Sequence, residues 1–257
     1  MSMAEQWIAF MTIVRKEIKR YLRIWTQTLL PSAITMSLYF IIFGRLIGSR
    51  IGEMDGFSYM QFVVPGLIMM AIVTNSYSNV VSSFFGSKFN HSVEELLVSP
   101  VSNYVILMGY VVGGVTRGLL VAVVVTIVSL FFTDLHVHSY LLVVVVVLMT
   151  STLFALAGFI NAVFANNFDD ISIVPTFVLT PLIYLGGVFY SMDLLPDFWA
   201  GVSKLNPLVY VVNAFRYGVL GVSDVSLPVA LGMIVLFTAL AFAFSMRLLN
   251  RGTRLRQ

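Results

Sequence analysis

Residues 135–168 read LHVHSYLLVVVVVLMTSTLFALAGFINAVFANNF, a run of 34 residues without an Asp, Glu, Lys or Arg between Asp134 and Asp169. A helix needs about 20 apolar residues to cross the hydrocarbon core of a bilayer. The run therefore predicts one membrane-spanning helix, and the same criterion can be applied along the rest of the chain.

Five further windows meet this criterion. They are residues 24–44, 56–87, 104–132, 171–192 and 225–246, and Arg117 is the one charged residue inside them. The chain of 257 residues is 59% hydrophobic and 11% charged, whereas a soluble domain carries about 25% charged residues. We therefore predict an all-α integral membrane protein with six membrane-spanning helices in a single domain, residues 1–257, and exclude an ordinary soluble enzyme.

Residues 1–24 predict a helix of a different kind. Six apolar side chains recur at spacings of three or four residues, while five basic side chains fall mostly on the other faces. The six are Trp7, Met11, Val14, Ile18, Leu22 and Trp25. This pattern is typical of an amphipathic helix that lies on the membrane surface. The basic residues also have a simpler explanation, in which they only orient the first span.

Residues 191–225 fit neither a full span nor a polar loop. The uncharged run between Lys204 and Arg216 has only 11 residues, which is typical of an interfacial or re-entrant segment. Prolines and a glycine divide the region, and aromatic residues such as Trp199 suit the headgroup level of a bilayer. We predict a re-entrant pair of short helices here, before the last span.

The positions of Lys and Arg predict the orientation of the chain. Six spans place both termini on one side, and that side holds ten of the fifteen basic residues. The ten are Arg15, Lys16, Lys19, Arg20, Arg23, Lys88, Arg247, Arg251, Arg254 and Arg256, and the other side holds Arg45, Arg50, Lys204 and Arg216. This excess predicts that both termini and the 83–102 loop are cytoplasmic and that the 191–225 region is exterior.

All twelve acidic residues fall in loops or at the ends of the predicted spans. Carriers driven by protons or sodium ions generally place ionisable groups inside the membrane, so such a carrier is disfavoured. The chain also lacks a G-x-x-x-x-G-K-[ST] phosphate loop, so we expect no ATP hydrolysis by this chain alone and no bound cofactor. His136 and His138 fall short of the three or four ligands of a typical zinc site, so we expect no metal.

Arg117 is the one ionisable residue well inside a predicted span. A charge at the bilayer centre costs about 2.5–3.5 kcal/mol on insertion scales, so the side chain should face protein or a polar path. We predict a structural role, in which Arg117 pairs with a carbonyl or with a carboxylate such as Asp169. Contact with a substrate is the alternative.

The loop after the second window reads KFNHSVEELLVSP at residues 88–100. Ser92 and Glu95 have the spacing of a capping box, which predicts a short helix that begins at Ser92 and ends before Pro100. Such a turn can be purely structural. A short helix with two leucines beside two carboxylates can also be gripped by a groove in a partner protein.

Three stretches of this sequence resemble the permease subunits of type-2 ATP-binding-cassette (ABC) transporters, and the resemblance extends over nearly the whole chain. The first is YMQFVVPGL at residues 59–67, and the second is EELLVSP at residues 94–100. The third includes LGGVFY at residues 185–190 and FRYG at residues 215–218. One departure is visible, since many members have an Arg-Glu-x-Gly-Thr-like run where this chain has FNHS at residues 89–92.

The resemblance implies a half-transporter of a bacterial inner membrane that pairs with a second copy and with two cytosolic ATPase subunits, which bind ATP and Mg. It implies that the short helix is a coupling helix, with ATPase contacts at Lys88, Phe89, His91, Glu94, Glu95, Leu96 and Leu97. It also implies a translocation path lined by Thr28, Thr35, Tyr39, Asn75, Tyr77, Phe177 and Tyr184. The expected function is ATP-driven export of an amphipathic drug, a lipid or a polysaccharide; the alternative is a secondary carrier or channel without an ATPase partner.

Overall fold

The computed structural model describes residues 2–252, without the side chain of Arg45, so Arg254 and Arg256 lie outside the described residues. Five helical stretches in this part of the chain are long and apolar enough to cross a membrane. They are Trp25–Ile51, Tyr59–Phe89, Asn103–Ser129, Tyr140–Phe164 and Leu227–Arg251. The prediction of an all-α membrane protein is therefore confirmed at the level of helix content and long apolar helices.

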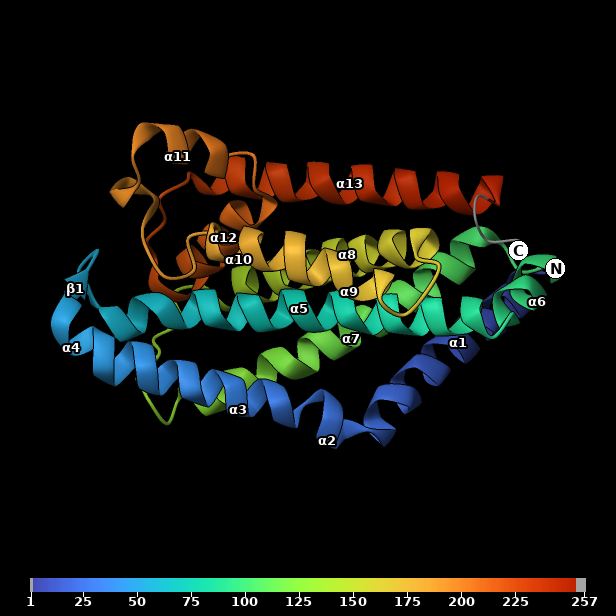
Figure 1. Cartoon of the computed structure of the whole chain (residues 1–257), viewed down its shortest axis with the longest axis horizontal. Helices are drawn as coiled ribbons and strands as arrows, with labels where there is room; N and C mark the ends of the chain where they lie inside the picture. Colours follow the sequence, from blue (N-terminus) through green and yellow to red (C-terminus); the bar gives the residue numbers. More distant parts are fainter. Residues whose placement is uncertain (1, 253–257) are drawn as a thin grey trace.

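Helix α5 (Tyr59–Phe89) runs through the middle of the bundle, between α7 (Asn103–Ser129) and α8 (Tyr140–Phe164) (Figure 1). Helix α13 (Leu227–Arg251) lies on α8 and on the shorter α12 (Pro207–Leu220). A capping box of Ser58 and Gln61 starts α5. Because α5 has neighbours on most sides, most of its residues are buried, including polar ones such as Asn75 and Ser83.

Glycines let the three central helices approach closely. A Cβ atom at Gly158 of α8 would lie 2.5 Å from the backbone oxygen of Tyr77 on α5. A Cβ atom at Gly118 of α7 would meet the hydroxyl oxygens of Ser76 and Ser151. Small residues at helix contacts are typical of membrane bundles, where close backbone packing replaces much of the hydrophobic driving force.

The first apolar stretch consists of α2 (Trp25–Thr28), α3 (Leu30–Tyr39), the π-helix η1 (Phe40–Ile47) and α4 (Gly48–Ile51). It leads into a hairpin of β1 (Glu53–Met54) and β2 (Phe57–Ser58), in which Glu53 pairs with Ser58 and Met54 with Phe57. The two turn residues between the strands, Asp55 and Gly56, both have positive φ, as a two-residue hairpin of type I′ requires.

The 171–192 window does not form one long helix. It contains α9 (Asp170–Val174), the π-helix η2 (Pro175–Leu179) and α10 (Thr180–Tyr184), a run of 15 residues from Asp170 to Tyr184. At 1.5 Å per residue this run is about 22 Å long, less than the roughly 30 Å of a hydrocarbon core. Two prolines in the run, which lack a backbone N–H group, account for the irregular hydrogen bonding.

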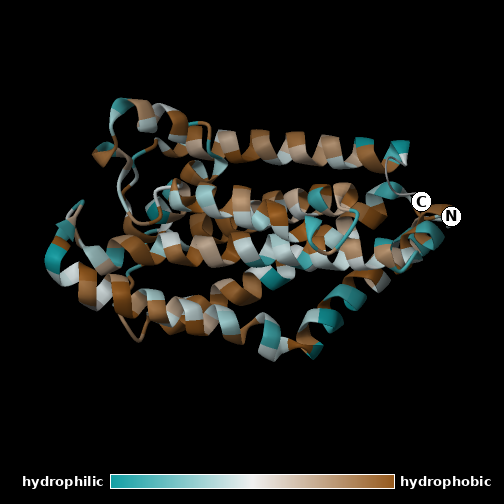
Figure 2. Ribbon diagram, in the orientation of Figure 1, coloured by the Kyte–Doolittle hydropathy of each residue, from teal (hydrophilic) through white to brown (hydrophobic). Residues whose placement is uncertain are grey.

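Residues 191–225 form η3 (Met192–Leu194), α11 (Asp197–Ser203) and α12, so the predicted short helices are present. The hairpin, α4 and α11 lie at one end of the molecule, which we call the α11 end (Figure 1). The opposite end, which we call the α6 end, holds α6 (Ser92–Val98), the start of α1 (Met3–Arg23) and the end of α13. Hydrophilic residues concentrate toward these two ends, and apolar ones between them (Figure 2).

Candidate coupling site

Helix α6 is the short helix that the sequence predicts, and it runs from Ser92 to Val98. The residue before it, His91, has a φ of 57°, a left-handed conformation that is uncommon for residues other than glycine. The predicted capping box is wrong. The Ser92 hydroxyl donates instead to the carbonyl of Ser87 on α5 (3.0 Å), and no side chain caps α6.

One face of α6 packs on the bundle and the other is exposed. Val93 is buried, and Leu96 and Leu97 are partly buried against the core. On the other face Glu95 is exposed, and Val98 is 86% exposed. The leucines therefore hold α6 in place, whereas Val98, which the sequence analysis did not single out, is the apolar side chain that a partner can reach.

We call Phe89, His91, Glu94, Glu95 and Val98 the α6 surface, because their side chains are exposed or half-exposed at this end of the molecule. The imidazole Nδ1 of His91 lies 3.3 Å from Oε1 of Glu94. The ring of Phe89 lies 5.0 Å from that of Phe168, at the chain segment that leads to α9. The α6 surface thus combines carboxylates with exposed apolar groups.

Lys88 is not part of this surface. Its side chain is buried, and its ammonium group donates to the carbonyls of Val163 (2.8 Å) and Ala165 (2.7 Å). These are terminal carbonyls of α8, which have no partner within the helix, and a cation there also interacts favourably with the helix dipole. Lys88 therefore joins the end of α5 to the end of α8, directly before α6.

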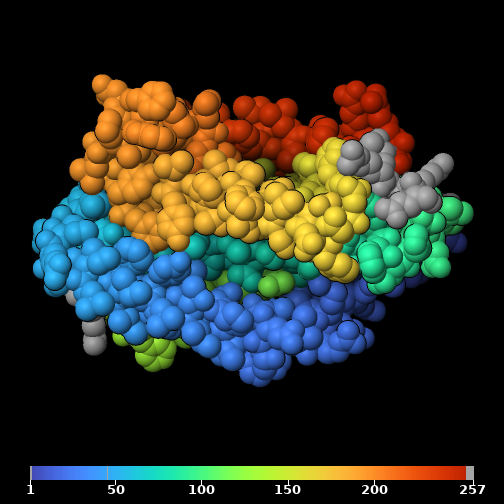
Figure 3. All heavy atoms as spheres, in the orientation of Figure 1, coloured from blue at the N-terminus to red at the C-terminus, as the bar shows by residue number. Residues whose placement is uncertain are grey.

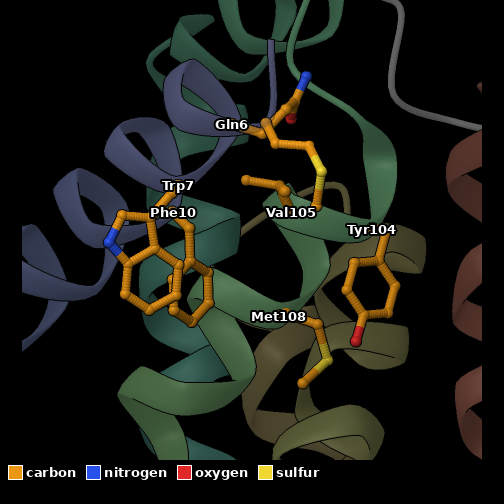
Figure 4. Close-up of a pocket in the computed structure, with 7 residues that line it drawn as sticks. Gln6, Trp7, Phe10, Tyr104, Val105 and Met108 are labelled. Carbon is orange, nitrogen blue, oxygen red and sulfur yellow. The ribbon is translucent and has the colours of Figure 1, made fainter.

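Helix α1 supports the other side of the α6 loop. The Gln6 side-chain amide donates to the carbonyl of Pro100 (3.1 Å) and accepts from the backbone N–H of Ser102 (3.1 Å). Gln6 also lines a pocket of about 390 Å³ between α1 and α7, together with Trp7, Phe10 and Tyr104 among others (Figure 4). The chain segment after α6 is therefore attached to α1.

A buried polar network attaches α1 to α5. Glu17 has no exposed surface and accepts a hydrogen bond from the Ser83 hydroxyl, while Arg20 lies 3.3 Å from the Glu17 carboxylate. The Arg20 guanidinium also donates to the backbone and side-chain oxygens of Asn79 (2.8 and 2.9 Å). A single glutamate within a basic stretch, with an arginine three positions later, is the sequence signal for such a network.

The buried face of α1 differs from the predicted apolar face. It contains Ile13, Val14, Glu17 and Tyr21, whereas Trp7 is 62% exposed. Ile13 and Glu17 fit against Gly109 and Gly113 of α7, where a Cβ atom would lie 2.6 Å from either side chain. Helix α1 is thus amphipathic, as predicted, and one side of it is packed on the bundle.

Arg117 pairs with Asn75 and not with Asp169. Its guanidinium donates to the amide oxygen of Asn75 (2.9 Å), and the Asn75 amide nitrogen donates to the Ser32 hydroxyl (3.0 Å). These bonds connect α7, α5 and α3. The carbonyl oxygen that Arg117 contacts belongs to a side-chain amide. Sequence spacing does not reveal that Asn75 is this partner.

Comparison with known proteins supplies the remaining observation. The sequence profile of a family described as ABC-2 type transporter matches residues 8–220. The chain belongs to this family. Among curated relatives, the inner membrane transport permease YadH of Escherichia coli K12 is 59% identical over 250 residues, which cover 97% of this chain and 98% of that protein. Nodulation protein J of Rhizobium leguminosarum bv. viciae is 24% identical over 215 residues, 83% of each chain.

Membership in the ABC-2 family makes this chain a transmembrane transport permease and not an enzyme. Permeases of the family normally pair with an ATPase subunit.

The seven residues expected along a translocation path lie in different surroundings. Thr28 and Tyr77 are buried, and Asn75 is held by Arg117. Thr35 and Phe177 are exposed on α3 and η2. The rings of Tyr39 and Tyr184 both pack on the ring of Phe189, with centroid separations of 6.3 and 5.7 Å.

The α11 end of this ABC-2 permease contains a buried arginine. Arg216 has no exposed surface, and it donates to the carbonyl of Gly187. Its guanidinium lies 3.9 Å above the ring of Phe62 and 3.9 Å from the Asp224 carboxylate. Asp224 in turn accepts from the backbone N–H of Met192 (2.7 Å). The FRYG stretch therefore ties the loops before and after α11 and α12 to the start of α5.

Proposed function

We propose that this chain is the membrane subunit of an ATP-driven exporter in a bacterial inner membrane. Two copies form the permease, and two cytosolic ATPase subunits bind ATP and Mg. The observation that carries the proposal is the α6 surface, because it is exposed on one side and braced on the other by Lys88, Gln6 and the two leucines. A short helix mounted in this way can pass a push on to the bundle.

The proposed topology has six crossings, with both termini and α6 in the cytoplasm. The sixth crossing is the run from α9 to α10 together with the segment that follows it, and α11 and α12 form the re-entrant pair on the exterior side. Support comes from the α6 end, which holds Lys88 at the end of α5 and Arg247 and Arg251 at the end of α13. An excess of Lys and Arg is typical of the cytoplasmic side.

The proposed mechanism follows from the attachments of α6. When ATP binding closes the ATPase subunits, the α6 surface is displaced, and Lys88 and Gln6 pass the displacement to α8 and α1. The network of Glu17 and Arg20 carries it on to α5. The displacement thereby reaches the membrane-spanning helices α5 and α8.

The second copy is proposed to pack against the exposed apolar face that α3, η1 and the α9–α10 run share. In the space-filling view both segments lie on the face turned to the reader, with atoms of α5 visible between them (Figure 3). Ile34, Leu38, Phe177 and Val178 are among the large apolar residues exposed on these segments. The substrate, which we propose to be an amphipathic drug, a lipid or a polysaccharide, would cross at this seam.

The test is co-purification of the ATPase with variants of the full-length chain from its native membrane. Val98→Asp and Glu95→Lys change exposed residues of the α6 surface, so they should reduce the amount of recovered ATPase while leaving the permease in the membrane. Glu53→Lys is the matched control, because Glu53 is an exposed carboxylate at the α11 end. It should leave recovery unchanged.

Undiminished recovery with both α6 variants would remove the ATPase contact from α6. The transport mechanism has a separate test, in which the purified chain is placed in liposomes without any other protein. Uphill transport under those conditions would show that the chain is a secondary carrier.

A further inference from the structure

An apolar groove runs along the outer side of α7, α8 and α13. It has a volume of about 500 Å³ and is lined by Met108, Leu148, Leu156, Val235, Ala239 and Phe242 among others. Tyr104 and Met108 also line the pocket beside α1, so the two hollows adjoin (Figure 4). The groove lies on helices that are long and apolar enough to cross a membrane, and its surroundings are therefore the acyl chains of lipids.

The groove offers no free hydrogen-bonding group from its two threonines. The Thr152 hydroxyl donates to the carbonyl of Leu148 (2.8 Å), and the Thr238 hydroxyl donates to the carbonyl of Ile234 (2.7 Å). Both hydroxyl protons are used within their own helices. Apart from the Tyr104 hydroxyl, the described residues of the lining therefore offer no free hydrogen-bond donor and are mostly apolar, which suits an acyl chain.

A polar pocket lies toward the α6 end of α7 and α13. It has a volume of about 210 Å³, and its lining includes Leu97, Asn103, Asn250 and Arg251. The amide of Asn103 donates to the side-chain oxygen of Asn250 (2.9 Å), which joins the start of α7 to the end of α13. Among the described residues, the lining holds one basic side chain and no acidic one, and Arg251 forms no salt bridge.

The distance between the apolar groove and the polar pocket matches the length of one phospholipid molecule. Val235 and Arg251 are 16 residues apart on α13, which is about 24 Å at 1.5 Å per residue. Half of a bilayer with its headgroups is about 20–22 Å thick. The aromatic pair of Tyr104 and Phe242, with ring centroids 6.1 Å apart, lies between the polar and the apolar part.

We propose that an anionic phospholipid of the leaflet on the α6 side binds here, with its phosphate at Arg251 and one acyl chain in the groove. The uncompensated positive charge of the polar pocket selects an anionic headgroup over a zwitterionic one. Because Leu97 belongs to α6 and lines the polar pocket, the bound lipid also holds α6 against α13. The lipid site lies apart from the α3 and α9–α10 face and does not depend on the proposed export function.

The experiment uses the purified full-length chain in detergent and native mass spectrometry, titrated with phosphatidylglycerol or phosphatidylcholine. The wild-type chain should retain phosphatidylglycerol preferentially. Arg251→Gln should weaken phosphatidylglycerol binding by about tenfold, as expected for the loss of one charge-assisted hydrogen bond, and should weaken phosphatidylcholine binding less, because the choline cation offsets the charge of its phosphate. Ala239→Trp fills the groove and should weaken the binding of both lipids.

Two matched variants serve as controls. Leu240→Trp adds the same indole to an exposed position of α13 outside the groove, and Arg15→Gln removes an exposed charge from α1. Both should bind phosphatidylglycerol as the wild-type chain does. Equal binding of the two lipids by the wild-type chain, or equal losses in the test and control variants, would show adhesion to the apolar surface and overturn the site.

A second measurement reports on α6 directly. It uses only the wild-type chain and Arg251→Gln, so it does not depend on whether Ala239→Trp folds. In vesicles of phosphatidylcholine with one quarter phosphatidylglycerol, amide hydrogen exchange of residues 92–98 should be slower than in pure phosphatidylcholine. Arg251→Gln, which changes an exposed residue, should remove this difference. An exchange rate that does not respond to phosphatidylglycerol in the wild-type chain would contradict a lipid that contacts α6.

Discussion

The two ends of the molecule use their polar residues in opposite ways. At the α11 end Arg216 is inside, surrounded by the Gly187 carbonyl, the ring of Phe62 and the Asp224 carboxylate. At the α6 end the buried polar groups hold the helices around α6, while α6 itself exposes Glu95 and Val98. Polar contacts at the α11 end thus hold that end together from within, whereas buried polar contacts at the α6 end support an exposed surface. Variants at each end should therefore differ in kind as well as in size of effect.

The largest expected effect comes from Arg216→Ala. The substitution removes a fully buried cation, leaves Asp224 without that partner and opens a void over Phe62. Removing one partner of a buried ion pair typically costs about 3–5 kcal/mol. Thermal unfolding of the purified chain in detergent should show a clear loss, and Lys204→Ala, in the same region but outside the core, should not. An unchanged melting temperature in Arg216→Ala would show that the contacts of Arg216 with Gly187, Phe62 and Asp224 do not stabilise the fold.

A smaller loss is expected at the attachment of α1. Glu17→Ala leaves the Ser83 hydroxyl and one side of Arg20 without their buried partner, which costs about 1–3 kcal/mol. Glu17→Gln keeps a hydrogen-bond acceptor and should lose less. Limited proteolysis within α1 provides the readout, and exposed Glu5→Gln is the control. Equal resistance of Glu17→Ala and the wild-type chain would show that the network does not hold α1.

Asp55→Asn should stabilise the hairpin slightly at neutral pH. Desolvation, with the nearby Asp224 carboxylate, raises the pKa of Asp55 in the folded chain. Folding therefore favours the protonated Asp55 carboxyl. The stability that this carboxyl contributes is present at low pH and is lost as pH rises through the raised pKa. Asparagine also tolerates the positive φ at this position. The melting-temperature advantage of the variant should shrink from pH 7 to pH 4; a constant difference would contradict the electrostatic cause.

The smallest effect on stability is expected for Val98→Ala. Its side chain is 86% exposed, and surface substitutions usually change stability by less than about 0.5 kcal/mol. Melting curves should therefore overlay those of the wild-type chain, even where ATPase recovery falls. A clear loss of stability would show that α6 is part of the core and not a presented surface.

The sequence predicts the long helices well because length and apolar composition suffice for that purpose. It also places α6 within one residue, since His91-Ser92 and Pro100 limit the helix locally. It does not predict that the 171–192 window is broken, because the one π-helical and two α-helical pieces depend on hydrogen bonding around prolines.

Long-range partners are the part of the site that sequence does not supply. Lys88 looks like an exposed loop residue, yet its carbonyl partners are 75 and 77 positions away. Arg117 is recognisable as an unusual charge, but its partner on α5 depends on how α7 packs. The sequence pattern places Glu17 among loop and end positions, whereas its burial comes from packing on Gly113 of α7 and a hydrogen bond from Ser83 of α5.

The bond between Lys88 and α8 has a consequence for the order of assembly. A ribosome releases Lys88 long before Val163 and Ala165, which follow 75 and 77 residues later. Until those carbonyls arrive, the ammonium group has no such acceptors and stays hydrated. Nascent chains truncated before residue 163 should thus leave residues 88–100 accessible to protease, and elongation past Ala165 should protect them. The attachment of the segment before α6 is therefore complete only once the fourth long apolar helix, α8, has been synthesised.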